Sequence, residues 1–181
     1  GFIRNSQKYF KIEDCKMEGN VNGKSTGGIC GSFSGFSGYC EIIGCIMEGN
    51  VNGEAAGGIL GSSAGFRGGE CVVKNCRMIG NVSVLQAGGI CGSYAGYSGK
   101  CVVTDCGIKG NVLGNQSGGI CGSDAGYNGK CEIIGCIMEG NVNGQFAGGI
   151  CGSFAGSGNS GECLVTNCIM EGDVFLKSGG I

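Results

Sequence analysis

Residues 101–130 read CVVTDCGIKGNVLGNQSGGICGSDAGYNGK, and near copies of this stretch fill the rest of the chain. The triplet Gly-Asn-Val recurs every 30 or 31 residues, and it returns a last time, 32 residues on, as Gly-Asp-Val at Gly172. Self-similarity at a period of about 20 to 50 residues indicates a repeat architecture. We therefore expect a single repeat domain over residues 1–181, either a piece of a longer array or a filament subunit. Its units are approximately 1–29, 30–59, 60–90, 91–120, 121–150 and 151–181.

The composition excludes several classes of protein. Of the 181 residues 43 are Gly, none is Pro, and only 14% are charged, with a net charge of -2. Each Gly inside a helix costs about 1 kcal/mol relative to Ala, and a collagen helix needs a Gly-X-Y period. The small net charge and the lack of a basic run give no reason to expect a nucleic-acid partner. No apolar run approaches the ~20 residues of a membrane span.

Within a unit the apolar positions alternate with a period of two, which is a strand signal. Cys101 and Val103 share one face, and Cys106 and Ile108 resume the alternation with the opposite parity. This change requires a corner at residues 104–105, and a second corner is expected near Asn115. The third side has the pattern Gly-Gly-Ile-Cys-Gly-Ser-x-Ala-Gly, in which small residues face inward. The direction of its Ile stays open, because the adjacent Ile and Cys cannot both point inward from a flat strand.

Three short strands and three corners in each unit predict an all-β fold, a β-solenoid or β-helix. We expect about six triangular coils of ~30 residues, stacked ~4.8 Å apart through backbone hydrogen bonds. In-register stacking places equivalent side chains above one another. One such column is predicted to form a structural ladder that links the coils. Its members are Asn20, Asn50, Asn81, Asn111, Asn141 and Asp173.

A known family shares the pattern of residues 88–96, Gly-Gly-Ile-Cys-Gly-Ser-Tyr-Ala-Gly, which an apolar strand and Gly-Asn-Val follow. This pattern resembles the GLUG-type glycine-rich repeats of large bacterial surface proteins, in which a Gly-Gly-Leu-Val-Gly-like core precedes a similar strand. The likeness covers all six units, and the present chain is a cysteine-rich variant of the pattern. The resemblance implies a surface or adhesion-associated β-helix, with no catalytic residues to carry over.

The 15 cysteines fall into three columns. The first contains Cys40, Cys71, Cys101, Cys131 and Cys163, the second Cys15, Cys45, Cys76, Cys106, Cys136 and Cys168, and the third Cys30, Cys91, Cys121 and Cys151. One interpretation places a disulfide across the corner of each coil, each worth about 2 kcal/mol, which requires an oxidising compartment. These candidate bridges are Cys40–Cys45, Cys71–Cys76, Cys101–Cys106, Cys131–Cys136 and Cys163–Cys168. The alternative treats cysteine as a small buried apolar residue. We favour this alternative for the third column.

The sequence predicts neither a catalytic site nor a zinc site. It has no His and no Cys-x-x-Cys pair, so neither a cysteine nucleophile with a histidine base nor a zinc site is expected, and we expect no cofactor and no enzymatic activity. Two pairs of carboxylates, Glu18 with Glu48 and Glu139 with Glu171, lie on neighbouring coils. A divalent cation between two carboxylates is one interpretation, and a solvated face is the favoured one.

An aromatic column, Phe2, Phe36, Phe66, Tyr97 and Tyr127, suggests either a packed ladder or a stripe on which a glycan stacks, with Phe36, Phe66, Tyr97 and Tyr127 as the candidate stripe. The prediction we favour is a structural segment of an extracellular fibre, filament or surface stalk. Its partner would be another copy of the same chain, stacked end to end, or further coils of the same array. The alternative is an adhesin that binds a glycan, a host surface or a protein through its aromatic and acidic columns. Both roles place the chain outside the cell or at the cell surface.

Overall fold

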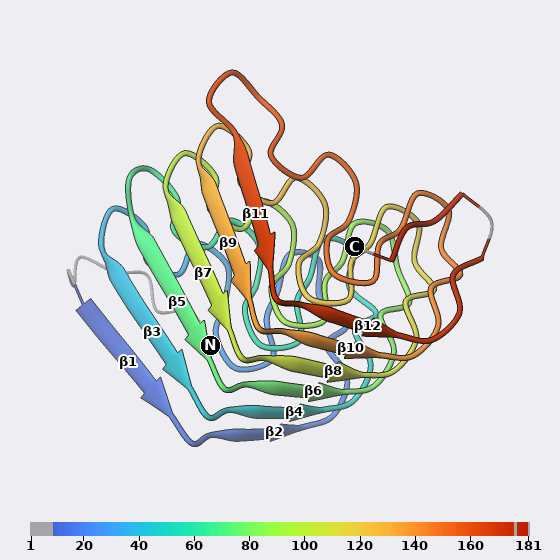
Figure 1. Cartoon of the computed structure of the whole chain (residues 1–181). Helices are drawn as coiled ribbons and strands as arrows, with labels where there is room; N and C mark the ends of the chain where they lie inside the picture. The colour runs from blue at the N-terminus through green and yellow to red at the C-terminus, as the bar shows by residue number, and fades with distance from the viewer. Residues whose placement is uncertain (1–8, 176, 181) are drawn as a thin grey trace.

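The computed structural model describes residues 9–175 and 177–180 and shows a β-solenoid built from two parallel sheets (Figure 1). No helix occurs among these residues. Sheet A contains β1 (Tyr9–Glu13), β3 (Tyr39–Ile43), β5 (Glu70–Lys74), β7 (Lys100–Thr104), β9 (Lys130–Ile134) and β11 (Glu162–Thr166). Sheet B contains β2 (Lys16–Glu18), β4 (Ile46–Glu48), β6 (Arg77–Ile79), β8 (Gly107–Lys109), β10 (Ile137–Glu139) and β12 (Ile169–Glu171). The predicted fold class is confirmed.

Equivalent residues of successive repeats pair directly. Cys101 of β7 lies opposite Cys71 of β5 and Cys131 of β9, and Met78 of β6 lies opposite Ile108 of β8. Each sheet contains one strand from every repeat, so the chain completes about five full turns from the first strand to the last. Because the pairing never shifts by a residue, each inward column stays inward along the whole solenoid.

A sharp corner joins the two sheets, as Figure 1 shows. β7 ends at Thr104, and β8 begins at Gly107. Between them Asp105 has a φ of 52°, and the equivalent Asn75 and Gly135 have φ values of 53° and 64°. Only Gly adopts this left-handed region freely, and Asn and Asp tolerate it better than other residues. The residue types at this position therefore explain why the strand turns there.

The third side of the coil is paired in the same register but does not form a continuous strand. Its isolated parallel bridges form two columns, represented by Gly118–Gly148 and Cys121–Cys151, and a further column, represented by Val112–Val142, lies before the second corner. The sequence predicted a strand here. Glycines that pack directly against the backbone of the next coil interrupt the ladder. A Cβ on Gly118 would overlap the backbone oxygen of Cys121 and lie 2.5 Å from the backbone nitrogen of Gly152.

The invariant Ile and the Cys after it both point inward. Ile90 and Cys91 have no exposed surface. Their two backbone N–H groups both donate to Ile120 O of the next coil, over 3.0 and 2.9 Å. Two successive donors on one acceptor require the chain to bend between them, so adjacent side chains enter the same core. The core is therefore a set of uninterrupted columns of Cys, Val, Ile, Met and Ala.

Candidate functional site

Aromatic side chains gather on the glycine-rich turns that precede sheet A. Phe2 of the predicted column lies outside the described residues. The candidate stripe is present: the ring centroids of Phe66 and Tyr97 are 4.7 Å apart in a stacked arrangement, and those of Tyr97 and Tyr127 are 5.4 Å apart edge to face. Phe36 contacts Phe66 at 5.5 Å. The rings thus contact one another from coil to coil. Phe36 is 40% exposed and the other three are half-buried, so the column is both packed and open to solvent.

Two further rings and a cation extend this column beyond the predicted residues. Tyr94 lies 5.8 Å from Tyr97 and 6.0 Å from Tyr127, and Phe33 lies 5.8 Å from Phe66. We call Phe33, Phe36, Phe66, Tyr94, Tyr97 and Tyr127 the aromatic patch. The guanidinium of Arg67 lies 5.5 Å from the centroid of the Phe66 ring, a cation–π distance.

Phe33 and Tyr94 do not stand out in the sequence as patch residues, because their column also contains Ser63 and Asp124. Both aromatic residues have a positive φ, near 58°, and this backbone conformation turns their side chains toward the neighbouring column. Burial raises the pKa of Tyr94. The one available signal was a repeated pattern in which one aromatic residue lies two positions before a Gly and another follows that Gly directly.

The two predicted pairs of carboxylates differ in what lies beside them. Lys16 Nζ lies 2.7 Å from a Glu18 oxygen and 3.0 Å from a Glu48 oxygen, so its ammonium stands where a bridging cation would. Glu139 and Glu171 are opposite each other in β10 and β12. In the described part of the chain, no group of three or more Cys, Asp or Glu side chains is arranged to hold a metal ion.

The outer face of sheet A carries a row of alternating charges. Lys100 contacts Glu70 and Glu132 at 3.4 and 3.2 Å, and Lys130 contacts Glu132 and Glu162 at 2.9 and 3.5 Å. The hydrogen bond from Lys130 holds the pKa of Glu132 below its usual value. Exposed ion pairs contribute only about 0–1 kcal/mol each. The row therefore makes the outer face of sheet A hydrophilic and adds little to the stability of the fold.

A groove of about 450 Å³ crosses the outer face of sheet B. It forms because Gly107 has no side chain in a column where its neighbours are Arg77 and Ile137. A Cβ there would meet only Ile137 O, at 3.7 Å. Lys109 and Glu139 also line it, so the groove has mixed charge.

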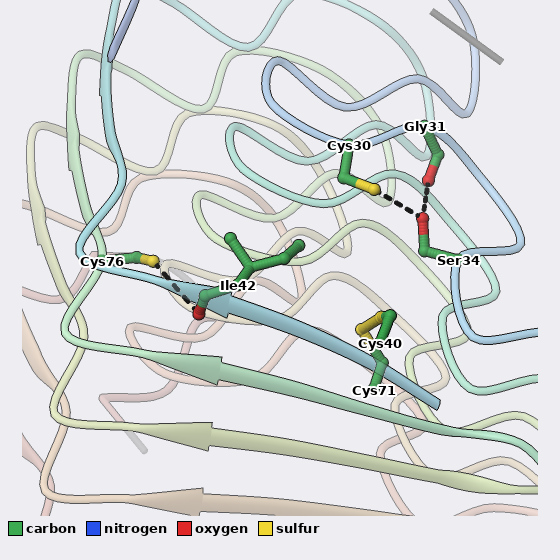
Figure 2. Close-up of a disulfide and its surroundings, with 7 residues drawn as sticks. All are labelled: Cys30, Gly31, Ser34, Cys40, Ile42, Cys71 and Cys76. Atoms are coloured by element: carbon green, nitrogen blue, oxygen red, sulfur yellow. Dashed lines mark hydrogen bonds between the residues drawn. A yellow bond between two sulfur atoms is a disulfide. The ribbon is translucent and has the colours of Figure 1, made fainter. Parts of the chain in front are cut away.

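The structure places the cysteines differently from the predicted bridges. Cys40 Sγ is bonded to Cys71 Sγ of the next coil, with the two Cα atoms 4.7 Å apart (Figure 2). Cys45 and Cys76 are free thiols. None of the five predicted corner pairings is formed. The first-column and second-column side chains both point inward, but the corner at residues 104–105 and its equivalents separate them along the chain. Stacking instead brings sulfurs of one column together.

The second-column thiols form a hydrogen-bonded ladder of their own. Cys106 Sγ donates to Thr104 O at 3.3 Å and accepts the backbone N–H of Cys76 at 3.4 Å. Cys45 Sγ likewise donates to Ile43 O at 3.4 Å, and the backbone N–H of Cys45 donates to Cys76 Sγ at 3.4 Å. Burial raises the pKa of the Cys45 thiol to about 11. These thiols act as small buried residues that also satisfy backbone groups at the corner.

The asparagine column forms a continuous ladder. Asn20 Oδ1 accepts the backbone N–H of Asn50, Asn50 Oδ1 that of Asn81, and so on to Asp173, at distances of 2.8 to 2.9 Å. Each side chain thus bonds the backbone of the next coil and not its side chain. In each coil the ladder thus provides a hydrogen-bond acceptor for a backbone N–H at the turn that follows the strand of sheet B.

The described residues include no helix able to span a membrane. No protein-family model, curated protein or solved structure matches this chain.

Proposed function

We propose that this chain is a structural β-solenoid segment of an extracellular fibre, filament or surface stalk that assembles by stacking of coils. The observation that carries the proposal is the unbroken register. From β1 to β11 and from β2 to β12, every described coil repeats the same backbone pairing and the same buried columns. Interactions that repeat with each coil favour extension along one axis.

Two further features support an external structural role. The asparagine ladder and the charge row of sheet A also run along the axis from coil to coil, so a further coil in the same register would meet matching groups. The Cys40–Cys71 disulfide joins two coils covalently and suits an oxidising compartment.

Self-assembly is tested with the purified chain. Analytical ultracentrifugation from micromolar to millimolar concentration, with negative-stain electron microscopy of the same samples, should show rods of constant width whose length grows with concentration. A chain that remains monomeric over this whole range would contradict assembly by stacking.

The aromatic patch favours a second candidate, an adhesin-type binding module for a glycan or a protein. Exposed aromatic rings beside a cation, here Phe36 and Arg67, are a common way to bind a sugar ring or a partner surface. An adhesin should show saturable binding on a glycan array or an immobilised surface, and Tyr97→Ala with Tyr127→Ala should abolish it. Phe146→Ala is the matched control, because Phe146 is an aromatic residue that is 51% exposed and lies outside the patch. A fibre segment predicts no such binding.

A further inference from the structure

Sulfurs of the first and third cysteine columns face each other across the core. Cys121 Sγ lies 3.9 Å from Cys131 Sγ, and Cys151 Sγ lies 3.6 Å from Cys163 Sγ. All four residues are free thiols. Cys121 and Cys131 lie 10 residues apart, and Cys151 and Cys163 lie 12 apart; in each pair one cysteine comes from the third side and the other from sheet A of the same coil.

We propose that oxidation converts these contacts into disulfides within single coils, Cys121–Cys131 and Cys151–Cys163. A disulfide has an S–S length of about 2.05 Å, so each sulfur has to move by roughly 0.8 to 0.9 Å. Each bridge would join the third side to sheet A and close the glycine-rich turn between them. Cys91 and Cys101, which have the same spacing and the same columns, form the third pair of this set.

The chemistry is thiol–disulfide exchange with a low-molecular-weight disulfide. One cysteine thiolate attacks that disulfide, forms a mixed disulfide and releases one small thiol. The second cysteine then attacks the protein sulfur, so the protein disulfide forms and a second small thiol leaves. The two protons of the cysteines end on the two released thiols. Two cysteines are oxidised, and one small disulfide is reduced.

The single vacancy in the third column explains the one bond that runs between coils. Leu60 occupies the third-column position of its coil, so Cys71 has no thiol opposite it. Cys71 is bonded instead to Cys40 of the preceding coil. Cys30 is then left without Cys40, and its sulfur lies 2.9 Å from Ser34 Oγ (Figure 2). Because the Ser34 hydroxyl donates to Gly31 O, the Cys30 thiol is the donor to Ser34.

The two proposed bridges differ in access to an oxidant. Cys121 and Cys131 have no exposed surface, whereas Cys151 and Cys163 are half-buried. Native protein should therefore form Cys151–Cys163 first. Cys121–Cys131 should form only when the chain refolds in the presence of the oxidant.

Peptide mapping tests the pairing. Fully reduced chain is exposed to oxidised glutathione, once folded and once during refolding in a glutathione redox buffer, and free thiols are then alkylated. Digestion with trypsin and a glutamate-specific protease places Cys121 on residues 110–130, Cys131 on 131–132, Cys151 on 140–162 and Cys163 on 163–171. Mass spectrometry should find 140–162 linked to 163–171 in both samples, and 110–130 linked to 131–132 after refolding.

Matched variants show which cysteine column forms each disulfide link. Cys163→Ser should abolish the link between 140–162 and 163–171, and Cys168→Ser, a second-column change on the same peptide, should leave it. Leu60→Cys should move Cys71, on residues 71–74, from its link with 25–41 to a link with 55–67.

Other outcomes would overturn the proposal. Links from 131–132 to 101–109 or to 163–171 would show that Cys131 pairs with another coil, as Cys71 does, and not with Cys121 of its own coil. Alkylation of all four thiols after oxidative refolding would show that the facing sulfurs do not react. Both results are read on the unmodified sequence, so they do not depend on whether a variant folds.

Discussion

The asparagine ladder shows how one side-chain atom joins two coils. Asn81 Oδ1 accepts the backbone N–H of Asn111, and Asn111 Oδ1 accepts that of Asn141, both at 2.8 Å. Asn111 is half-buried, and water does not freely replace a lost acceptor at such a site. The side chain is therefore needed for its oxygen and not for its amide nitrogen.

Replacing Asn111 tests this role. Asn111→Ala should lower the free energy of unfolding by about 1 to 3 kcal/mol, because the N–H of Asn141 loses its acceptor. Asn111→Asp keeps an acceptor, as Asp173 does at the last position, and should cost less. Asn143→Ala, at an exposed position in the next coil, is the control and should change the free energy of unfolding by less than about 0.5 kcal/mol. Urea denaturation of the reduced proteins measures all three, and equal losses for Asn111→Ala and Asn143→Ala would refute the role.

The buried thiol of Cys45 makes stability depend on pH. Burial raises the pKa of Cys45 to about 11, whereas a cysteine in an unfolded chain ionises near pH 8.5. As pH rises the unfolded chain loses this proton first, so the stability is fully present below about pH 8.5 and is lost toward pH 11. The free energy of unfolding should fall over this window by at most about 1.4 kcal/mol per pH unit for this thiol. Urea denaturation at several pH values under reducing conditions measures the slope.

Two variants test whether the Cys45 thiol causes this pH dependence. Cys45→Ala should reduce it, whereas Cys15→Ala, at an exposed position of the same column, should not. A slope that is identical in all three proteins would mean that other groups cause the alkaline loss of stability.

At the scale of elements, the third side and sheet B use glycine for opposite reasons. Gly118 is needed because the backbone of its own coil at Cys121 and of the next coil at Gly152 leaves no room for a Cβ, whereas the space around Gly107 in β8 is open. The two positions therefore form a matched pair in which the same change of residue has opposite expected effects.

Gly118→Ala should destabilise the protein by about 3 kcal/mol or prevent folding, because the backbone of the coil has to move away. Gly107→Ala should be neutral or stabilise by about 0.5 kcal/mol, because Gly inside a strand is entropically unfavourable. Thermal unfolding followed by circular dichroism measures both. A Gly118→Ala protein as stable as the parent would show that the close stacking of the third side is not required.

At the scale of the whole molecule, each coil contacts only the coils next to it, and this makes stability additive along the axis. Residues 91–120 form one coil, and removing them joins Ile90 to Cys121, which restores Gly-Gly-Ile-Cys-Gly-Ser at the junction. The shortened chain keeps every inward column in register.

Deletion of residues 91–120 should therefore leave a folded β-solenoid with the same spectrum per residue. Its denaturant m-value should be lower by roughly one sixth, because less surface is buried. Deletion of residues 91–105 is the control, because it moves the inward columns out of alignment and should give an unfolded chain. If removing a full coil also abolished folding, stability would not be a sum over neighbouring coils.

The sequence by itself determined the coil period, the inward columns and the corner at Asp105. These features are local: alternation with a period of two sets which side chains face inward, and Asn, Asp or Gly at the corner sets where the strand turns. Only the tertiary structure decided which sulfurs meet, because the Cys121–Cys131 contact depends on how the third side folds back onto sheet A. The same is true of Tyr94, whose ring joins the aromatic patch through its backbone conformation. The direction of a side chain is encoded over two or three residues, but its distance from a partner 10 residues away depends on the closure of the whole coil.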